Sequence, residues 1–357
     1  MNSFYVNSQR NFQIAISEQC AKLYFMELLL QRLIMVELSL YGTCYNNSNS
    51  IRSSLDSITS QFDLNAGVEL VVVDNFSTDG TYEILKDYAA RLKNFKIIRE
   101  RCSRGRGRQL AYENTVGARV LNIDFDTTYS TTLSSALKFI GEEYRTGTIM
   151  PMGYADRRTM EMVGGWLDLN YAEDCELLAR AVSKGIEIFE FPAIIGENEV
   201  IEEGGREGRY ASSSIGRLKR YFEILRASII GNGLTLSRIN RDYRGKIWAA
   251  TILAFIVVRL SGTKIYSYSE TGWNWDLVKR EIKFLNPEKY GIPKERWFAN
   301  VQPMLSESSK EAMAQRLEKI GLNRKMQFSD GRIFFYTDET SAELLEKQMK
   351  IWKVKGH

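Results

Sequence analysis

The chain has almost no histidine. The only one among its 357 residues is His357, the last residue. A Ser-His-Asp triad, a histidine general base and a histidine-ligated metal are therefore nearly excluded, because each needs an imidazole inside the fold. Any catalysis has to use carboxylates and arginines instead.

Paired cysteines and long apolar segments are lacking as well. The four cysteines are scattered without a CxxC pair, which argues against a zinc site or a disulfide framework and for a reducing compartment. The apolar run 247–258 is shorter than the roughly 18 residues that cross a bilayer, so it predicts a buried or interfacial helix. Charges interrupt the apolar residues 23–36, which predict an amphipathic helix rather than a signal peptide. We expect a cytoplasmic protein, with peripheral membrane contact as an open alternative.

The overall composition is that of an ordinary globular protein. Hydrophobic residues make up 44% of the chain and charged residues 26%, and the length suits one large domain with a smaller one. The net charge of +4 is too small to indicate nucleic acid without a local cluster. One such cluster is the run of arginines from Arg99 to Arg108, interleaved with glycine. It favours contact with a nucleotide or acceptor phosphate, and a solvated surface or RNA binding are its alternatives.

Alternating strands and helices occupy the first half of the chain. The run 68–73 (VELVVV) is short, apolar and rich in valine, as in a strand that is buried on both faces of a parallel sheet. Strands are also predicted at 35–41, 95–99 and 119–123, and a helix at 107–116. We therefore expect an α/β fold with a mostly parallel, doubly wound sheet.

Two of these strands end in carboxylates. Asp74 begins the polar turn DNFSTDG, in which Ser77 or Thr78 is expected to cap the next helix. Asp124 and Asp126 follow the strand at 119–123. Open α/β sheets bind ligands at the C-terminal ends of their strands, and carboxylates there suit a nucleotide diphosphate bridged by a divalent cation. Strand termination and helix capping are the structural alternative for Asp74.

The order of these motifs resembles family-2 glycosyltransferases of the GT-A fold. The resemblance covers about Val36 to Ile195, and it rests on five stretches in the family's order. They are Thr43-Cys44-Tyr45-Asn46, VVVDNFSTDGT, Asp124-Phe125-Asp126, Gly164-Gly165-Trp166 and Glu173-Asp174-Cys175-Glu176-Leu177. It implies a GT-A-type, Rossmann-like sheet flanked by helices, and an inverting enzyme that takes a sugar from a UDP-, GDP- or dTDP-linked donor. Since no QxxRW sequence follows, a single-addition hexosyltransferase is expected rather than a processive synthase.

The resemblance also implies roles for individual residues on the donor side. Thr43 and Tyr45 would lie against the nucleobase, and Asp74 would accept a hydrogen bond from it. Arg108 would face the nucleotide, and Asp124 would contact the ribose or diphosphate.

The remaining roles concern the metal, the base and the acceptor. Asp126 would bind Mn²⁺ or Mg²⁺, hard cations that prefer oxygen ligands. Asp174 would be the general base, with its charged form and that of Glu173 stabilised by the positive end of a helix. Gly164, Gly165, Trp166 and Glu173 would line the acceptor side. A plain turn at the two glycines, and helix-dipole carboxylates at Glu173 and Asp174, are the structural alternatives.

Four regions are expected along the chain. We expect an N-terminal helix (1–34) that packs on a GT-A domain (35–200). A loop with basic and apolar helices, buried or at a membrane interface, is expected at 201–265, and a small α/β appendage at 266–357. The helix around 214–230 is basic and amphipathic, which suits an anionic membrane surface or a lipid-phosphate acceptor, or else a domain helix with solvated arginines. The acceptor itself, whether glycan, protein or lipid phosphate, is left open. A nucleotidyltransferase and a non-catalytic nucleotide-sugar- or RNA-binding protein are the alternative functions.

Overall fold

The structure is a computed structural model that describes residues 36–143, 146–198, 214–328, 331–343 and 345. The predicted N-terminal helix lies outside these residues. Residues 199–213 and most of those after 343 also lie outside them.

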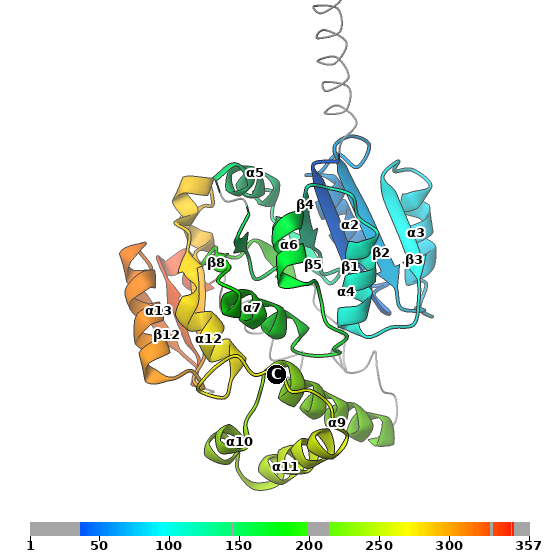
Figure 1. Cartoon of the computed structure of the whole chain (residues 1–357). Coiled ribbons are helices and arrows are strands. Elements are labelled where there is room, and N and C mark those ends of the chain that lie inside the picture. The colour runs from blue at the N-terminus through cyan, green and yellow to red at the C-terminus, as the bar shows by residue number, and fades with distance from the viewer. Residues whose placement is uncertain (1–35, 144–145, 199–213, 329–330, 344, 346–357) are drawn as a thin grey trace, which may run out of the picture.

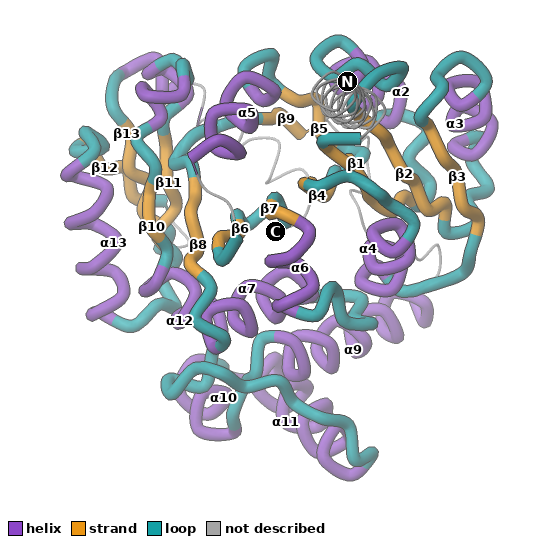
Figure 2. The backbone as a smooth tube through the Cα atoms, turned by 45° about the horizontal axis from the view of Figure 1, so that its top comes forward, coloured by secondary structure: helices purple, strands orange, loops and turns teal. Residues whose placement is uncertain are grey.

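A mostly parallel sheet of eight strands forms the centre of the molecule (Figures 1 and 2). Its strands are β1 (Leu38–Cys44), β2 (Val68–Asp74), β3 (Phe95–Arg99), β4 (Arg119–Asn122), β6 (Thr148–Ile149), β7 (Ala155–Asp156), β8 (Glu187–Glu190) and β10 (Lys283–Phe284). Their spatial order is β10-β8-β6-β7-β4-β1-β2-β3. Among these pairings, β7 is antiparallel to β4 and β6, and the others are parallel. The predicted α/β fold class is confirmed.

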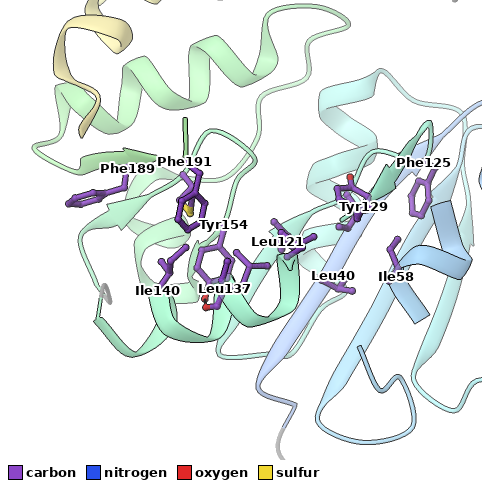
Figure 3. Close-up of a cluster of buried hydrophobic side chains, with 14 of the residues drawn as sticks. Leu40, Ile58, Leu121, Phe125, Tyr129, Leu137, Ile140, Tyr154, Phe189 and Phe191 are labelled. Atoms are coloured by element: carbon purple, nitrogen blue, oxygen red, sulfur yellow. Dashed lines mark hydrogen bonds between the residues drawn. The ribbon is translucent and has the colours of Figure 1, made fainter. Parts of the chain in front are cut away.

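Helices cover both faces of this sheet, which explains why its strands are apolar on both sides. The first face packs on α2 (Ile51–Thr59), α3 (Thr81–Ala89) and α5 (Leu133–Glu143), and the second on α4 (Arg104–Glu113), α6 (Arg157–Val163), α7 (Glu173–Ser183) and α12 (Asn274–Glu281). Leu40 and Leu121 belong to the first core cluster, part of which Figure 3 shows, whereas Tyr41 and Val120 belong to the second. Full burial of such a side chain stabilises the fold by about 1.5–3 kcal/mol.

Smaller sheets flank the C-terminal part of the central one. β5 (Thr127–Tyr129) pairs antiparallel with β9 (Gly196–Asn198) directly after the Asp124-Phe125-Asp126 turn. β11 (Phe298–Val301), β13 (Ile333–Tyr336) and β12 (Arg324–Gln327) form an antiparallel sheet beside α13 (Glu307–Lys319), after 3₁₀ turns at Pro287–Tyr290 and Lys294–Arg296. The region predicted as a small α/β appendage thus contains both strands and helices. A bridge between Ala193 and Trp297 joins this unit to the main domain.

A helical layer lies at one end of the molecule, below α7 in Figure 1. It contains α9 (Ser214–Gly231), α10 (Leu236–Asp242) and α11 (Gly245–Leu260). α11 packs on α9, and α9 packs on α7. No helix within the described residues is both long and apolar enough to cross a membrane.

Three local predictions were wrong. β1 covers Leu38–Cys44 rather than 35–41, because pairing with β2 continues to the register Cys44–Asp74. α4 begins at Arg104 rather than 107, since the Ser103 hydroxyl accepts a hydrogen bond from the amide of Arg106 and caps the helix earlier. Neither Ser77 nor Thr78 caps α3.

Gly80 is instead the residue that precedes α3, in the left-handed region at φ 94°. The Asp79 carboxylate accepts hydrogen bonds from the amide and hydroxyl of Thr81 and from the amide of Ser48. Burial alone would raise the pKa of Asp79, but these hydrogen bonds outweigh it and lower the pKa. The carboxylate therefore takes over the role that the serine and threonine were expected to play.

Candidate active site

A cavity of about 360 Å³ opens at the C-terminal end of β4. Charged side chains line it at Arg108 of α4, Asp124 after β4 and Asp174 of α7. Pro151 and Met152, the segment 193–196 and Phe298 of the C-terminal sheet complete much of the wall. Residues from distant parts of the chain therefore meet at the sheet edge where the sequence placed the site.

Arg108 joins the two carboxylate motifs. Its guanidinium donates to Asp124 Oδ1 at 2.9 Å and to Glu173 Oε1 at 2.9 Å, and it lies over the Trp166 ring. Burial alone would lower the pKa of Arg108, but the Asp124 and Glu173 carboxylates outweigh it and raise the pKa, so the side chain stays charged. Asp124 is about half exposed, whereas Glu173 is fully buried. Arg108 therefore fixes the DxD turn relative to the start of α7.

Asp174 lies in the first turn of α7, where the helix end was expected to stabilise its charged form. The pKa of Asp174 is instead raised. Burial raises the pKa of the Asp174 carboxyl, and the Glu173 carboxylate beside it adds to the rise. The Arg108 guanidinium and a hydrogen bond from the Cys175 amide oppose the rise without cancelling it. The positive end of the helix does not dominate here, because two adjacent carboxylates share a poorly solvated site. A raised pKa makes Asp174 a better proton acceptor.

Glu173 is anchored by arginines. Its Oε1 accepts from Arg108 and also from Arg104 at 3.3 Å, while its Oε2 is buried without a hydrogen-bond partner. The other arginines of the run contact further groups: Arg99 pairs with Asp74 and Arg106 with Glu113. Four of the five arginines in the run, Arg99, Arg104, Arg106 and Arg108, therefore form ion pairs in or near the site, and exposed Arg101 lies over the Phe76 ring.

The Gly164-Gly165-Trp166 segment is a tight turn that presents Trp166 to the cavity. Both glycines have positive φ, 95° and 67°. A Cβ at Gly165 would lie 2.2 Å from Gln109 Oε1, the atom that accepts the hydrogen bond of the Trp166 amide. The Trp166 indole N–H donates to the Tyr41 hydroxyl at 2.8 Å.

The residues predicted to hold the nucleobase lie elsewhere. Asp74 is fully buried, and its carboxylate pairs with Arg99 and accepts from the Ser77 amide. The Thr43 hydroxyl donates to the Val73 carbonyl, and Tyr45 is partly buried. None of the three predicted nucleobase contacts lines the cavity, so their roles remain predictions.

The predicted metal ligand is also set back from the cavity. Asp126 is 8% exposed and does not line it, whereas Asp124 does. No group of three or more His, Cys, Asp or Glu side chains that could hold a metal occurs in the described part of the chain. One open carboxylate still fits a cation that takes most of its ligands from donor phosphates and water, as Mg²⁺ commonly does.

Two features of the site were not foreseen. Asn122 lines the cavity from β4, and its Oδ1 is buried without a hydrogen-bond partner. Arg180 holds the glycine turn through the Gly165 carbonyl and pairs with Glu176, which also accepts from the Tyr268 hydroxyl. Asn122 ends β4 and precedes Asp124 by two positions, which is a usable sequence signal. The Arg180 cluster depends on the distant Tyr268 and carries no such signal.

The central domain matches a known family. Its residues 39–205 match the model described as glycosyl transferase family 2. The predicted recognition is thereby confirmed for this part of the chain, which contains every proposed site residue from Thr43 to Asp174.

Solved structures similar to the chain include two of TarS and one of a mannosyltransferase. A structure of TarS from S. aureus is 18% identical over 68% of this chain and 48% of the TarS chain, with a TM-score of 0.40. TarS 1–349 in complex with UDP-GlcNAc is 17% identical over 83% of this chain and 95% of the TarS chain, with a TM-score of 0.42. Mannosyltransferase PcManGT from Pyrobaculum calidifontis, with GDP-Man and Mn²⁺, is 17% identical over 64% and 76%, with a TM-score of 0.44. The matched part of this chain thus covers about half the length of the first TarS chain. No curated protein matches it.

Proposed function

We propose that this protein transfers a single hexose from a UDP-, GDP- or dTDP-linked donor to an acceptor hydroxyl, with inversion at the anomeric carbon. The family 2 domain supports glycosyl transfer. The observation that carries the mechanism is the shared cavity, in which the Asp174 carboxylate faces the same space as Arg108 and Asp124. A proton acceptor and the charged end of a donor site therefore lie together.

In the proposed reaction, Asp174 takes the proton from the acceptor hydroxyl as its oxygen attacks the anomeric carbon. A new carbon–oxygen bond forms while the bond to the diphosphate breaks, and the electron pair of that bond leaves with the nucleoside diphosphate. Arg108 and Asp124 would orient the donor from their positions in the same cavity, and the Arg108 guanidinium lies over the Trp166 ring. A bound Mn²⁺ or Mg²⁺ would neutralise the charge of the departing diphosphate.

The base assignment is tested with Asp174→Asn, which keeps the shape of the side chain and removes the proton acceptor. We expect turnover to fall by about 100- to 10,000-fold while donor affinity survives. The matched control is Glu161→Gln, since Glu161 is exposed on the neighbouring α6. Near-normal turnover in Asp174→Asn, or loss of donor affinity together with turnover, would place the base elsewhere.

The metal assignment compares two carboxylates. We keep Asp126 as the proposed ligand, and the exposure of Asp124 to the cavity makes it the competing candidate. Calorimetric titration of UDP and GDP with and without Mn²⁺ should show metal-dependent binding in the parent protein and its loss in Asp126→Asn. If only Asp124→Asn loses it, Asp124 is the ligand. If both variants keep it, neither carboxylate binds the cation.

A further inference from the structure

Residues 214–264, here called the basic helical layer, differ in charge from the rest of the protein. They contain ten Lys or Arg and two Asp or Glu, a net charge of +8, whereas the whole chain carries +4 and the remainder therefore −4. The layer comprises α9, α10 and α11 and lies at one end of the molecule in both views (Figures 1 and 2). Positive charge is thus concentrated on one projecting part of the fold.

The outer face of α11 is apolar. Ala254, Phe255 and Val258 are buried against the protein, but Leu253, Ile256 and Leu260 on the opposite side are 56%, 47% and 83% exposed. The spacing of three and four residues puts the exposed side chains on one stripe. A helix that is hydrophobic all round normally has an apolar environment on every side. Exposure of this apolar stripe of α11 to water is unfavourable.

The N-terminal half of α9 repeats the pattern. Ile215 and Leu218 are 82% and 70% exposed, and the exposed cations Arg217 and Lys219 alternate with them. At the start of α11, exposed Lys246 adjoins the exposed apolar run. Exposed apolar side chains among Lys and Arg are the composition of helices that lie in the interface of a membrane.

We propose that the basic helical layer docks on the surface of an anionic lipid bilayer. Phosphate headgroups would neutralise its +8 charge, and Leu253, Ile256 and Leu260 would enter the boundary with the acyl chains. RNA would satisfy the cations alone and leave these side chains in water. A second copy of the layer would cover the apolar stripe but bring two strongly positive surfaces together. A bilayer satisfies both properties at once.

The basic helical layer also contacts the start of α7, where Asp174 lies. A Cβ at Gly231, in the last turn of α9, would lie 2.8 Å from the carbonyl oxygen of Ala172, the residue before Glu173. The layer thus packs against the residue that precedes α7, the helix that carries Asp174. If the proposed transfer is correct, this position favours an acceptor carried on a lipid phosphate. The docking itself does not depend on that chemistry.

The test is co-sedimentation of the full chain with vesicles of phosphatidylcholine alone and of phosphatidylcholine mixed with phosphatidylglycerol. We expect binding only to the mixed vesicles, with an affinity that falls as salt is added. Binding needs neither donor nor turnover, so Asp174→Asn should bind vesicles normally. Failure of the docking proposal is therefore distinguishable from failure of the proposed transfer.

Variants separate the charges from the apolar stripe. The triple change Arg217→Gln, Lys219→Gln and Lys246→Gln should weaken binding by about 100-fold, because each cation near an anionic surface contributes about fivefold. The double change Leu253→Gln and Ile256→Gln should weaken binding about tenfold and leave its salt dependence in place. Both sets are exposed, so circular dichroism should show an intact fold.

The matched control is a triple change to Gln at exposed lysines outside the layer, Lys93, Lys138 and Lys319. Equal loss in this control, or no binding to the anionic vesicles, would overturn the proposal. So would gel filtration showing a dimer that Leu253→Gln and Ile256→Gln dissociate, or RNA binding tighter than vesicle binding.

Discussion

Arg108 should be worth far more to stability than its neighbour Arg106 on the same helix. The Arg108 side chain is 8% exposed and Glu173 is 1% exposed, with 2.9 Å between their charged atoms. Breaking a buried ion pair by removing one partner costs about 3–5 kcal/mol, because the other charge stays buried. The contact with half-exposed Asp124 adds at most about 1 kcal/mol. Since Arg104 still reaches Glu173 from a partly exposed position, we expect Arg108→Met to cost about 3 kcal/mol.

A double-mutant cycle tests the reason for this cost. Glu173→Gln removes the buried charge, so Arg108→Met in that background should cost only about 1 kcal/mol, a coupling of about 2 kcal/mol. Urea denaturation followed by circular dichroism measures each free energy of unfolding. The control is the pair Arg106–Glu113, which is 40% and 44% exposed, and for which Arg106→Met should cost less than about 1 kcal/mol. Equal costs for the two arginines, or additive effects in the cycle, would refute the reasoning.

Three further outcomes are expected. Asn122→Leu should leave stability unchanged or raise it by about 1 kcal/mol, because the change removes a buried acceptor that has no partner. If that acceptor binds the substrate, donor affinity or turnover should fall. Unchanged donor affinity and turnover would exclude such a role. Gly165→Ala should cost about 1–3 kcal/mol in thermal or urea unfolding, because φ is +67° and Gln109 must shift away from the Trp166 amide. Asp174→Asn should be more stable than the parent at neutral pH. The pKa of Asp174 is raised in the folded state, so the Asp174 carboxyl contributes less to stability as the pH rises from its unfolded pKa to its folded pKa. Urea unfolding of the two proteins should therefore give the same free energy below the unfolded pKa.

Local sequence determined half of the sheet, since four of its eight strands were predicted. The run 68–73 occurs as β2, because a short β-branched apolar segment suits a strand that is covered on both faces, and the segment Phe95–Arg99 occurs beside it as the edge strand β3. The positions of the carboxylates after β2 and β4 followed from the same pattern. The resemblance between motifs then identified the family that the matched domain confirms.

Tertiary structure decided where the side chains lie and what charge they carry. Asp74 and Asp124 both follow parallel strands, yet Arg99 neutralises the first inside the protein while the second opens to the cavity. Ser77 was a plausible cap for α3, but the Asp79 carboxylate accepts the hydrogen bond of the Thr81 amide instead and also accepts one from the distant Ser48 amide.

The pKa of Asp174 depends on the same long-range packing. A helix start by itself favours a charged carboxylate, and only the burial of Asp174 next to Glu173 reverses this preference. Motif order is a property of the chain and can be read along it. Desolvation and charge pairing depend on atoms that are distant in sequence, and only the folded protein brings them together.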